Sequence, residues 1–432
     1  MIRWKIKRGR DQSVRQGHPW ILREDIVSMG KNLVPGTLVE LVDDKDQFVA
    51  WGYGNHESKI AVRILGRKSD DFRGLSIHFF VDRVMAAWKR KHELGVRGSF
   101  RLVYSEGDQM PGLIADRYVA ESAGKQFQVF SIQILTAGME RILRDAVTFF
   151  RVVAEKALAE GFSEFNWDQS VIVLRNDSSS RKNEGLDVMV PQVLKSVRDI
   201  ELNQCDILVR ATHGESFLKF NCDLYQGQKT GFFLDQFYNI FLVNEEIALR
   251  NWPKDQPIQI LDLCCYVGHW GVQLSRRLLD LGYKVETTVV DVSQPALERA
   301  IKNVKRAGAE VTGFKKDVLK ELADLPDQSF HIVIADPPAF AKQKKDIPTA
   351  EHAYMKLSAQ AFRLAKPTGL VAACSCSGAV REDAFLQAVN KGLQRSERSA
   401  RLIKTGGHSP DHPLLPHFPE GEYLKMNLFE ML

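Results

Sequence analysis

Long apolar runs are absent from this sequence: none can cross a bilayer, although 44% of the 432 residues are hydrophobic. The basic start, MIRWKIKRGR, is followed by no apolar segment and therefore does not resemble a secretory signal. Both absences predict a cytoplasmic protein without a membrane partner. A length of 432 residues exceeds what one hydrophobic core usually organises, so two or three domains are expected.

Cysteine is also scarce, with six residues in the chain. Cys264 and Cys265 are adjacent, and Cys374 and Cys376 are one residue apart. Neither spacing is typical of a disulfide framework, and zinc-binding pairs usually have two or more intervening residues. The sequence therefore predicts reduced thiols and no metal site.

Two N-terminal regions differ in pattern. Residues 1–75 contain short alternating segments, TLVELVD, FVAWGYG and KIAVRIL, that predict a small β-barrel. Residues 76–205 begin with a helical pattern that ends at Gly95. They continue with the strands FQVFSIQIL and SVIVLRND around a helix near 136–160, which predicts a central α/β domain.

The third region, residues 206–432, alternates strands with helices. Strands are predicted at 258–263, 284–290, 330–336 and 369–375, and helices at 271–282, 295–308 and near 350–365. Such alternation is typical of a parallel sheet with helices on both faces. Ligands bind such a sheet beyond the carboxyl ends of its strands, so the residues after each strand are the candidates for a site.

The first of these strands ends at Asp262 and leads into the turn CCYVGHWG. Gly268 and Gly271 let the backbone turn sharply and approach a ligand at the start of the next helix. The turn lacks the GxGxxG pattern of a dinucleotide site, which disfavours a nicotinamide oxidoreductase. The alternative is a plain tight turn.

Aspartates follow the next two predicted strands. Asp291 lies 23 positions after Gly268, near the spacing of about 20 expected for a carboxylate that binds ribose hydroxyls. Asp317 ends VTGFKKD, where it would accept a hydrogen bond from an adenine amino group. Each aspartate could instead cap a helix. Together with the glycine turn they predict a nucleoside without phosphate, and S-adenosylmethionine (SAM), a sulfonium cation, fits an acidic pocket.

The fourth strand leads into DPPAF, residues 336–340. Pro337 and Pro338 fix the backbone after Asp336 and remove two N–H donors. A rigid carboxylate close to Phe340 suits a flat base that is both hydrogen-bonded and stacked. The alternative is a rigid loop without a substrate.

The last strand ends in CSCSGAV, residues 374–380, where alternation places Cys374 and Cys376 on the same face. A thiolate at this edge could add to carbon 6 of a cytosine, which makes carbon 5 nucleophilic toward a sulfonium methyl group. Cys376 is the predicted nucleophile because it lies further past the strand, and Cys374 is predicted to pack. The alternative is that both are small buried hydrophobic residues.

Basic residues gather near the N-terminus and include Lys7, Arg8 and Arg10. A basic edge of this kind suits a phosphate backbone, although the net charge of the chain is only +5. The alternative is a solvated surface.

Several motifs span nearly the whole chain: GHPWILREDI with PGTLVELVDD, RLVYSEGDQMPGLIADRY, LRNDSSSRKNEGL, GQKTGFFLDQ, DPPAF, SCSG and GHSPDHPLLPHFPEGEYLK. Together they resemble the RlmI-like family of large-subunit ribosomal RNA cytosine-C5 methyltransferases. The resemblance implies an N-terminal RNA-binding PUA barrel, a central α/β domain and a Rossmann-like class I SAM methyltransferase sheet. It also implies SAM as the cofactor and ribosomal RNA as the partner.

Individual roles follow from the same resemblance. The implied SAM contacts are Gln228, Lys229, Thr230, Phe233, Asp262, Tyr266, Gly268, Asp291 and Asp317. The implied substrate contacts are Pro337, Pro338 and Phe340. Lys7, Arg8 and Arg10 are predicted as further substrate contacts from the basic edge alone. Asp336 would hold the base and help to protonate it, and Cys376 would be the nucleophile. Ala339 stands where many RNA cytosine-C5 methyltransferases of other families have a second cysteine, so the base that removes the proton is not identified.

The sequence therefore predicts a SAM-dependent ribosomal RNA methyltransferase that makes 5-methylcytosine through a Cys376 adduct. Two alternatives stay open. One is methylation of another base, such as guanine N7, and the other is a non-catalytic RNA-binding protein of ribosome assembly. Whether the protein forms a homodimer is also left open.

Overall fold

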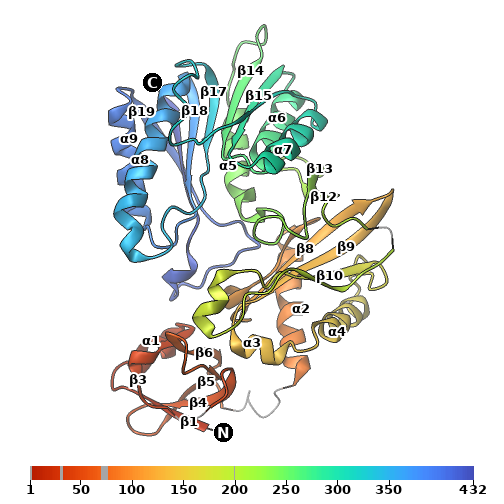
Figure 1. Ribbon diagram of the computed structural model, residues 1–432, viewed down its shortest axis with the longest axis vertical. Coiled ribbons are helices and arrows are strands. Elements are labelled where there is room, and N and C mark those ends of the chain that lie inside the picture. The colour runs from red at the N-terminus through yellow and green to blue at the C-terminus, as the bar shows by residue number, and fades with distance from the viewer. Residues whose placement is uncertain (1, 30–32, 70–75, 199) are drawn as a thin grey trace. The chain divides into compact units, whose positions relative to one another are not determined.

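The chain folds into two structural units, each built from segments that are not contiguous in the sequence. The computed structural model describes residues 2–29, 33–69, 76–198 and 200–432 (Figure 1). The first unit contains Met1–Ile207, Asp223–Phe232 and Pro410–Gly421, and the second contains Leu208–Cys222, Phe233–Ser409 and Glu422–Leu432. The motif GQKTGFFLDQ therefore belongs partly to each unit, because the boundary lies between Phe232 and Phe233.

The N-terminal part of the first unit is a β-barrel-like sheet in the order β2-β6-β5-β4-β1-β3. Its elements are β1 (Ile2–Ile6), α1 (Asp11–Gln16), β2 (Trp20–Leu22), β3 (Ile26–Ser28), β4 (Thr37–Val42), β5 (Phe48–Gly54) and β6 (Ile60–Gly66). The three predicted strands are β4, β5 and β6. The other three strands were not predicted; two of them have three residues each, too few to show an alternating pattern.

The rest of the first unit is a sheet in the order β11-β10-β9-β8, with β7 also paired to β8. Its elements are α2 (Ile77–Glu93), β7 (Phe100–Tyr104), β8 (Leu113–Ser122), β9 (Lys125–Ile134), α3 (Ala137–Ile142), α4 (Ala146–Ala159), β10 (Ser170–Leu174) and β11 (Gln192–Lys195). The helix predicted near 136–160 is two helices. Asp145 starts the second one, because its carboxylate accepts the Thr148 N–H at 2.9 Å.

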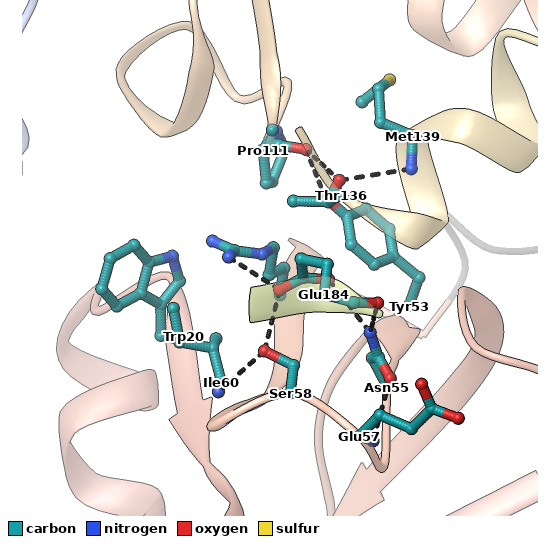
Figure 2. A network of polar contacts seen from close by, with 12 residues as sticks. Trp20, Tyr53, Asn55, Glu57, Ser58, Ile60, Pro111, Thr136, Met139 and Glu184 are labelled. Carbon is teal, nitrogen blue, oxygen red and sulfur yellow. Dashed lines mark hydrogen bonds and ion pairs between the residues drawn. The ribbon is translucent and has the colours of Figure 1, made fainter. Parts of the chain in front are cut away.

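The barrel and the central sheet share one hydrophobic core, to which Trp51, Tyr53 and Leu65 contribute from the barrel. A polar network joins the same two parts (Figure 2). Glu184, from the motif LRNDSSSRKNEGL, accepts hydrogen bonds from Ser58 Oγ at 2.8 Å and Asn55 Nδ2 at 3.2 Å. The barrel is thereby fastened to the central sheet by both apolar and polar contacts.

The second unit contains the predicted parallel sheet, in the order β16-β15-β14-β17-β18-β20-β19. Its strands are β14 (Ile258–Leu263), β15 (Val285–Asp291), β16 (Glu310–Lys315), β17 (Phe330–Ala335), β18 (Ala365–Ser375), β19 (Ala400–Gly406) and β20 (Lys425–Met431). β14 to β18 are parallel, whereas β20 runs antiparallel to both β18 and β19. The two antiparallel strands were not predicted from the sequence.

The second unit also contains the helices that pack on this sheet. They are α5 (Phe237–Ala248), α6 (His269–Asp280), α7 (Gln294–Arg306), α8 (Ile347–Leu364) and α9 (Glu382–Arg395). α6 packs on β14 and β15, α7 on β15 and β16, and α8 on β17 and β18. A hairpin precedes them: β12 (Cys205–Arg210) carries the chain into the second unit, where β13 (Phe217–Cys222) lies beside it.

No helix in the part of the chain that the structure describes has the length and apolar character needed to span a membrane. Nor do the described residues contain a group of three or more side chains that could hold a metal ion.

Candidate active site

The turn after β14 reverses the chain sharply at the carboxyl edge of the sheet. Cys264, Tyr266 and Gly268 all have positive φ angles, of 61°, 49° and 83°. A Cβ atom at position 268 would lie 3.2 Å from the Ala300 Cα atom in α7, so glycine also permits close packing there. The turn delivers the backbone N–H groups at the start of α6 to the edge of the sheet.

Asp262, the penultimate residue of β14, is fully buried. Its Oδ2 atom accepts the Gly271 N–H at 3.0 Å, and its Oδ1 atom has no partner among the described residues. Burial raises the pKa of this carboxyl to about 8, and the nearby charges of Asp336 and Asp291 raise it further. A cation next to this carboxyl group would therefore stabilise its ionised form.

Asp291, at the end of β15, ties the two neighbouring loops together. Its Oδ2 atom accepts the Tyr266 N–H at 2.9 Å, and its Oδ1 atom accepts the Ser293 N–H at 2.8 Å. Each carboxylate oxygen keeps a second lone pair that can accept from a ligand hydroxyl. The Tyr266 ring meets the Phe233 ring edge to face, with centroids 5.0 Å apart.

Asp336, which follows β17, is held by two N–H donors. Trp270 Nε1 donates to its Oδ2 atom at 3.0 Å, and Gln236 Nε2 donates to its Oδ1 atom at 2.8 Å. Asn239 in turn donates to Gln236 Oε1 at 2.7 Å, which fixes the orientation of the amide. Trp270 is buried, with 4% of its surface exposed. The two hydrogen bonds to Asp336 were not predicted.

Cys376 is half-buried, and its thiol lies against the loop that carries Asp336. Its Sγ atom is 3.7 Å from the carbonyl oxygen of Pro337, to which it donates. Cys374, two residues earlier, is 1% exposed, in agreement with the prediction that it packs in the core. Burial raises the pKa of the Cys374 thiol well above its ordinary value, so this group stays protonated.

Phe340 and Pro338 complete the DPPAF loop. The ring of Phe340 is half-buried and lies 4.9 Å, centroid to centroid, from the ring of Tyr354 in α8. Pro337 is buried, whereas Pro338 is exposed. The loop thus presents one fixed carboxylate and one partly accessible aromatic ring.

Tyr354 also braces the CSCSG segment. Its hydroxyl accepts from Ser375 Oγ at 2.8 Å and lies 2.8 Å from Ser377 Oγ. Ser377 Oγ accepts the Ala341 N–H at 3.1 Å, so the two substrate-side loops are joined. Sequence reasoning missed this residue, because Tyr354 stands inside an ordinary helical pattern.

Asp317 and His269 have local partners. Asp317 pairs with Lys320 at 2.9 Å and accepts the Leu319 N–H at 3.0 Å; the hydrogen bond from Lys320 is the main cause that lowers its pKa. These bonds hold a turn and not the start of a helix, because no helix lies between β16 and β17 in the described residues. The contact of Asp317 with adenine stays a prediction. His269 is buried, with Nδ1 3.2 Å from the Phe233 carbonyl oxygen.

Three predicted cofactor residues belong to the first unit. Thr230 is fully buried and donates its hydroxyl proton to Asp116, and its Oγ1 atom lies 3.0 Å from the Tyr118 hydroxyl. Gln228 is exposed and Lys229 is half-buried with a φ angle of 53°. Their contacts with SAM stay predictions.

The basic residues Lys7, Arg8 and Arg10 are exposed on the barrel, as a phosphate contact requires. Arg10 lies 3.2 Å from Asp25 and Arg8 lies 3.9 Å from Asp44. Exposed pairs of this kind contribute little to stability and leave the charges available to solvent. Their contact with RNA stays a prediction.

Comparison with known families matches two parts of the chain. A family model for a PUA-like domain matches residues 5–67, which form the barrel. A family model for a methyltransferase domain matches residues 260–369, which include β14 to β17 and the start of β18. The predicted fold class is confirmed by these matches together with the sheet order.

Curated relatives match over nearly the full length. A protein of Photobacterium profundum named ribosomal RNA large subunit methyltransferase I is 29% identical over 97% of each chain. A protein of the same name from Shewanella denitrificans is 30% identical over 98% of each chain.

Solved structures show the same fold. A structure from Streptococcus mutans, described as a SAM-dependent methyltransferase, is 19% identical and superposes with a TM-score of 0.73 over all of both chains. Another, of a methyltransferase in complex with S-adenosylhomocysteine (SAH), is 18% identical with the same TM-score and the same coverage.

Proposed function

Because the chain belongs to the family of ribosomal RNA large subunit methyltransferase I, we propose that it methylates carbon 5 of a cytosine in large-subunit ribosomal RNA. The cofactor is SAM, and the reaction would take place in the cytoplasm. Cys376 is the proposed nucleophile. The observation that carries this proposal is the 3.7 Å contact between Cys376 Sγ and the carbonyl oxygen of Pro337, the residue after Asp336.

The residues at the carboxyl edge of the sheet fit SAM. The unpartnered Oδ1 atom of Asp262 and the nearby carboxylates of Asp291 and Asp336 suit a ligand with an ammonium and a sulfonium group. Phe233 and Tyr266 would flank it with aromatic surface. When bound, SAM supplies an electrophilic methyl group.

The residues of the chain supply the activation of the base. The Cys376 thiolate would add to carbon 6, so that a carbon–sulfur bond forms and the electron pair of the 5,6 double bond becomes nucleophilic at carbon 5. After methylation, removal of the carbon 5 proton restores the double bond and breaks the carbon–sulfur bond, which returns the thiolate. Stacking hides carbon 6 in a helix, so the target base must be flipped out of its stack.

Asp336 would orient the cytosine. Its two carboxylate oxygens are fixed by Trp270 and Gln236. A fixed carboxylate accepts from the 4-amino group of a cytosine at its pairing edge, and Phe340 would contact the face of the base. Fixing the carboxylate before the base arrives removes the cost of ordering it in the complex.

The product identifies the reaction directly. The protein is incubated with labelled SAM and unmodified large-subunit ribosomal RNA, and mass mapping locates the methylated base. We expect 5-methylcytosine with the wild-type protein and none with Cys376→Ala. Cys374→Ala is the matched control, because it removes a thiol from the same strand without removing the proposed nucleophile.

A covalent trap tests the adduct separately. A 5-fluorocytosine at the target position carries fluorine in place of the carbon 5 proton, and fluorine cannot be removed by a base. The adduct with Cys376 should therefore accumulate and survive denaturing electrophoresis. Full methylation by Cys376→Ala, or methylated guanine as the product, would overturn the cytosine chemistry in favour of another base. No binding of SAM in calorimetry would leave only the non-catalytic RNA-binding alternative.

A further inference from the structure

Lys425 is a buried lysine beside the proposed nucleophile. It is the first residue of β20 and pairs in register with Ser375 of β18, the residue before Cys376. Its Nζ atom donates to the carbonyl oxygens of Ser377 at 2.9 Å and Val380 at 2.8 Å. The side chain is only 4% exposed, so the ammonium group is bound to the loop rather than to solvent.

A buried ammonium group needs compensation. Burial lowers the pKa of Lys425, while the nearby acidic groups Glu422, Cys376 and Glu382 act in the opposite direction. Two carbonyl acceptors satisfy two of its three N–H groups, and dipoles alone offset only part of the desolvation of a full charge. An anion at Cys376 would supply the remaining stabilisation, and the attraction between the two groups is mutual.

The other groups around Cys376 do not favour its thiolate. Tyr354 of α8 and Cys374 of β18 are neutral near pH 7, because burial raises the pKa of both. Asp336, on the loop after β17, is acidic and opposes a second negative charge nearby. Among these neighbours the cation is Lys425, on β20.

We propose that Lys425 is a positioning residue of the methyl-transfer site: its ammonium group fixes the loop after Cys376 and stabilises the thiolate of that cysteine. This role rests on the proposed function of Cys376 as the nucleophile. A free cysteine has a pKa of about 8.5 and is mostly protonated at neutral pH, so a fixed positive charge increases the reactive fraction. Lys425 does not itself contact the reacting atoms in this proposal.

Alkylation of Cys376 by iodoacetamide, followed by peptide mass mapping, measures the thiolate without RNA or SAM. The rate is followed from pH 5 to pH 10 in the wild type, Lys425→Met, Lys425→Gln and Lys425→Arg. Methionine removes both the charge and the donors, glutamine keeps a donor without the charge, and arginine keeps both. We expect alkylation at pH 7 to be about tenfold slower in the Met and Gln variants, because a nearby opposite charge changes the pKa of an ionisable group by about 1 or more. The Arg variant should stay close to the wild type.

The rate at high pH distinguishes a charge effect from a change of shape. If Lys425 stabilises the thiolate, the Met and Gln variants reach the same high-pH rate as the wild type, with a higher midpoint. An unchanged midpoint in both variants, with or without a lower plateau, would overturn the proposal. If Lys425→Met does not fold, as judged by thermal unfolding, the Gln variant decides.

The two proposals fail in different ways. Cytosine methylation by Cys376→Ala would remove the proposed function but would not alter the alkylation profiles. Unshifted profiles together with a Cys376-dependent adduct would keep the function and remove only the role of Lys425. In the enzyme assay, a thiolate role predicts that the acidic limb of the profile of rate against pH shifts to higher pH in Lys425→Gln. In Lys425→Arg it should return to the position that it has in the wild type.

Discussion

At the scale of single residues, the most unusual group is the buried carboxyl of Asp262. Its pKa of about 8 lies far above the value of about 3.9 for an unfolded chain, mainly because of burial. A pKa raised by folding means that the native protein holds a proton that the unfolded chain releases. The stability that this proton provides is complete below about pH 4 and is lost as the pH rises to about 8.

Asp262→Asn tests that sign. Asparagine keeps an oxygen for the Gly271 N–H but cannot ionise, so its stability should not fall over this pH range. Between pH 4 and pH 8, we expect the free energy of unfolding of the variant to rise by a few kcal/mol relative to that of the wild type. The reason is that a tenfold change in an ionisation constant corresponds to about 1.4 kcal/mol. Urea unfolding at a series of pH values measures the difference. Parallel stability curves for the two proteins would contradict the raised pKa.

The sequence predicts Asp336 and Cys376 as site residues but does not predict the groups that hold them. Both follow apolar strands, and a residue after a strand of a parallel sheet points to a site by its position alone. Trp270 and Gln236 reach Asp336 from positions 66 and 100 residues away. Contacts across such separations depend on how α6 and the Leu234–Gln236 turn pack, which residue spacing does not encode.

At the scale of elements, the segment after β18 is held from two sides. Tyr354 of α8 bonds to the hydroxyls of Ser375 and Ser377, and Lys425 of β20 bonds to carbonyl oxygens of the same segment. The predicted strand at 369–375 begins at Ala365 in the structure, and its antiparallel partner was missed. Because that missed pairing sets Lys425 beside Ser375, the position of the lysine could not be derived from the sequence.

Tyr354→Phe removes the hydroxyl that joins the two serines. Two buried hydroxyl groups then lose a partner, which should cost about 1–3 kcal/mol of stability. We also expect slower methylation, because the backbone of Cys376 lies between the two serines. Tyr283→Phe is the matched control: its hydroxyl makes a 3.3 Å bond to the Arg250 carbonyl before β15, at the amino end of the sheet. Urea unfolding and the methylation rate are compared, and equal rates in both variants would contradict a role for the brace.

At the scale of the whole molecule, residues in two motifs of the central sheet bind side chains of the barrel. Arg63 of β6 donates to Glu106 at 2.7 Å and to Glu184 at 3.0 Å, and Trp20 of β2 donates to Glu106 at 2.7 Å. Glu106 and Glu184 stand in the motifs EGDQMPGLIADRY and LRNDSSSRKNEGL, which the sequence indicated only as family signatures. Figure 2 shows Glu184 among its partners from the barrel. These motifs therefore keep the barrel in a fixed orientation on the central sheet.

Arg63→Met tests this fastening. The change leaves the buried carboxylates of Glu106 and Glu184 without their guanidinium partner, and breaking a buried pair in this way costs about 3–5 kcal/mol. Arg3→Met is the control, because the Arg3 side chain is 65% exposed in its pair with Glu40 and should contribute less than about 1 kcal/mol.

Two measurements distinguish an effect on the barrel from an effect on the SAM site. Urea unfolding should show an earlier transition for Arg63→Met. Calorimetry below that transition should show SAM binding like that of the wild type, because Arg63 lies in the barrel, which contains none of the predicted SAM contacts. RNA methylation should fall further than SAM binding if the barrel must be held in place to present RNA. A stability change no larger than that of Arg3→Met would show that the shared apolar core, rather than the ion cluster, holds the barrel.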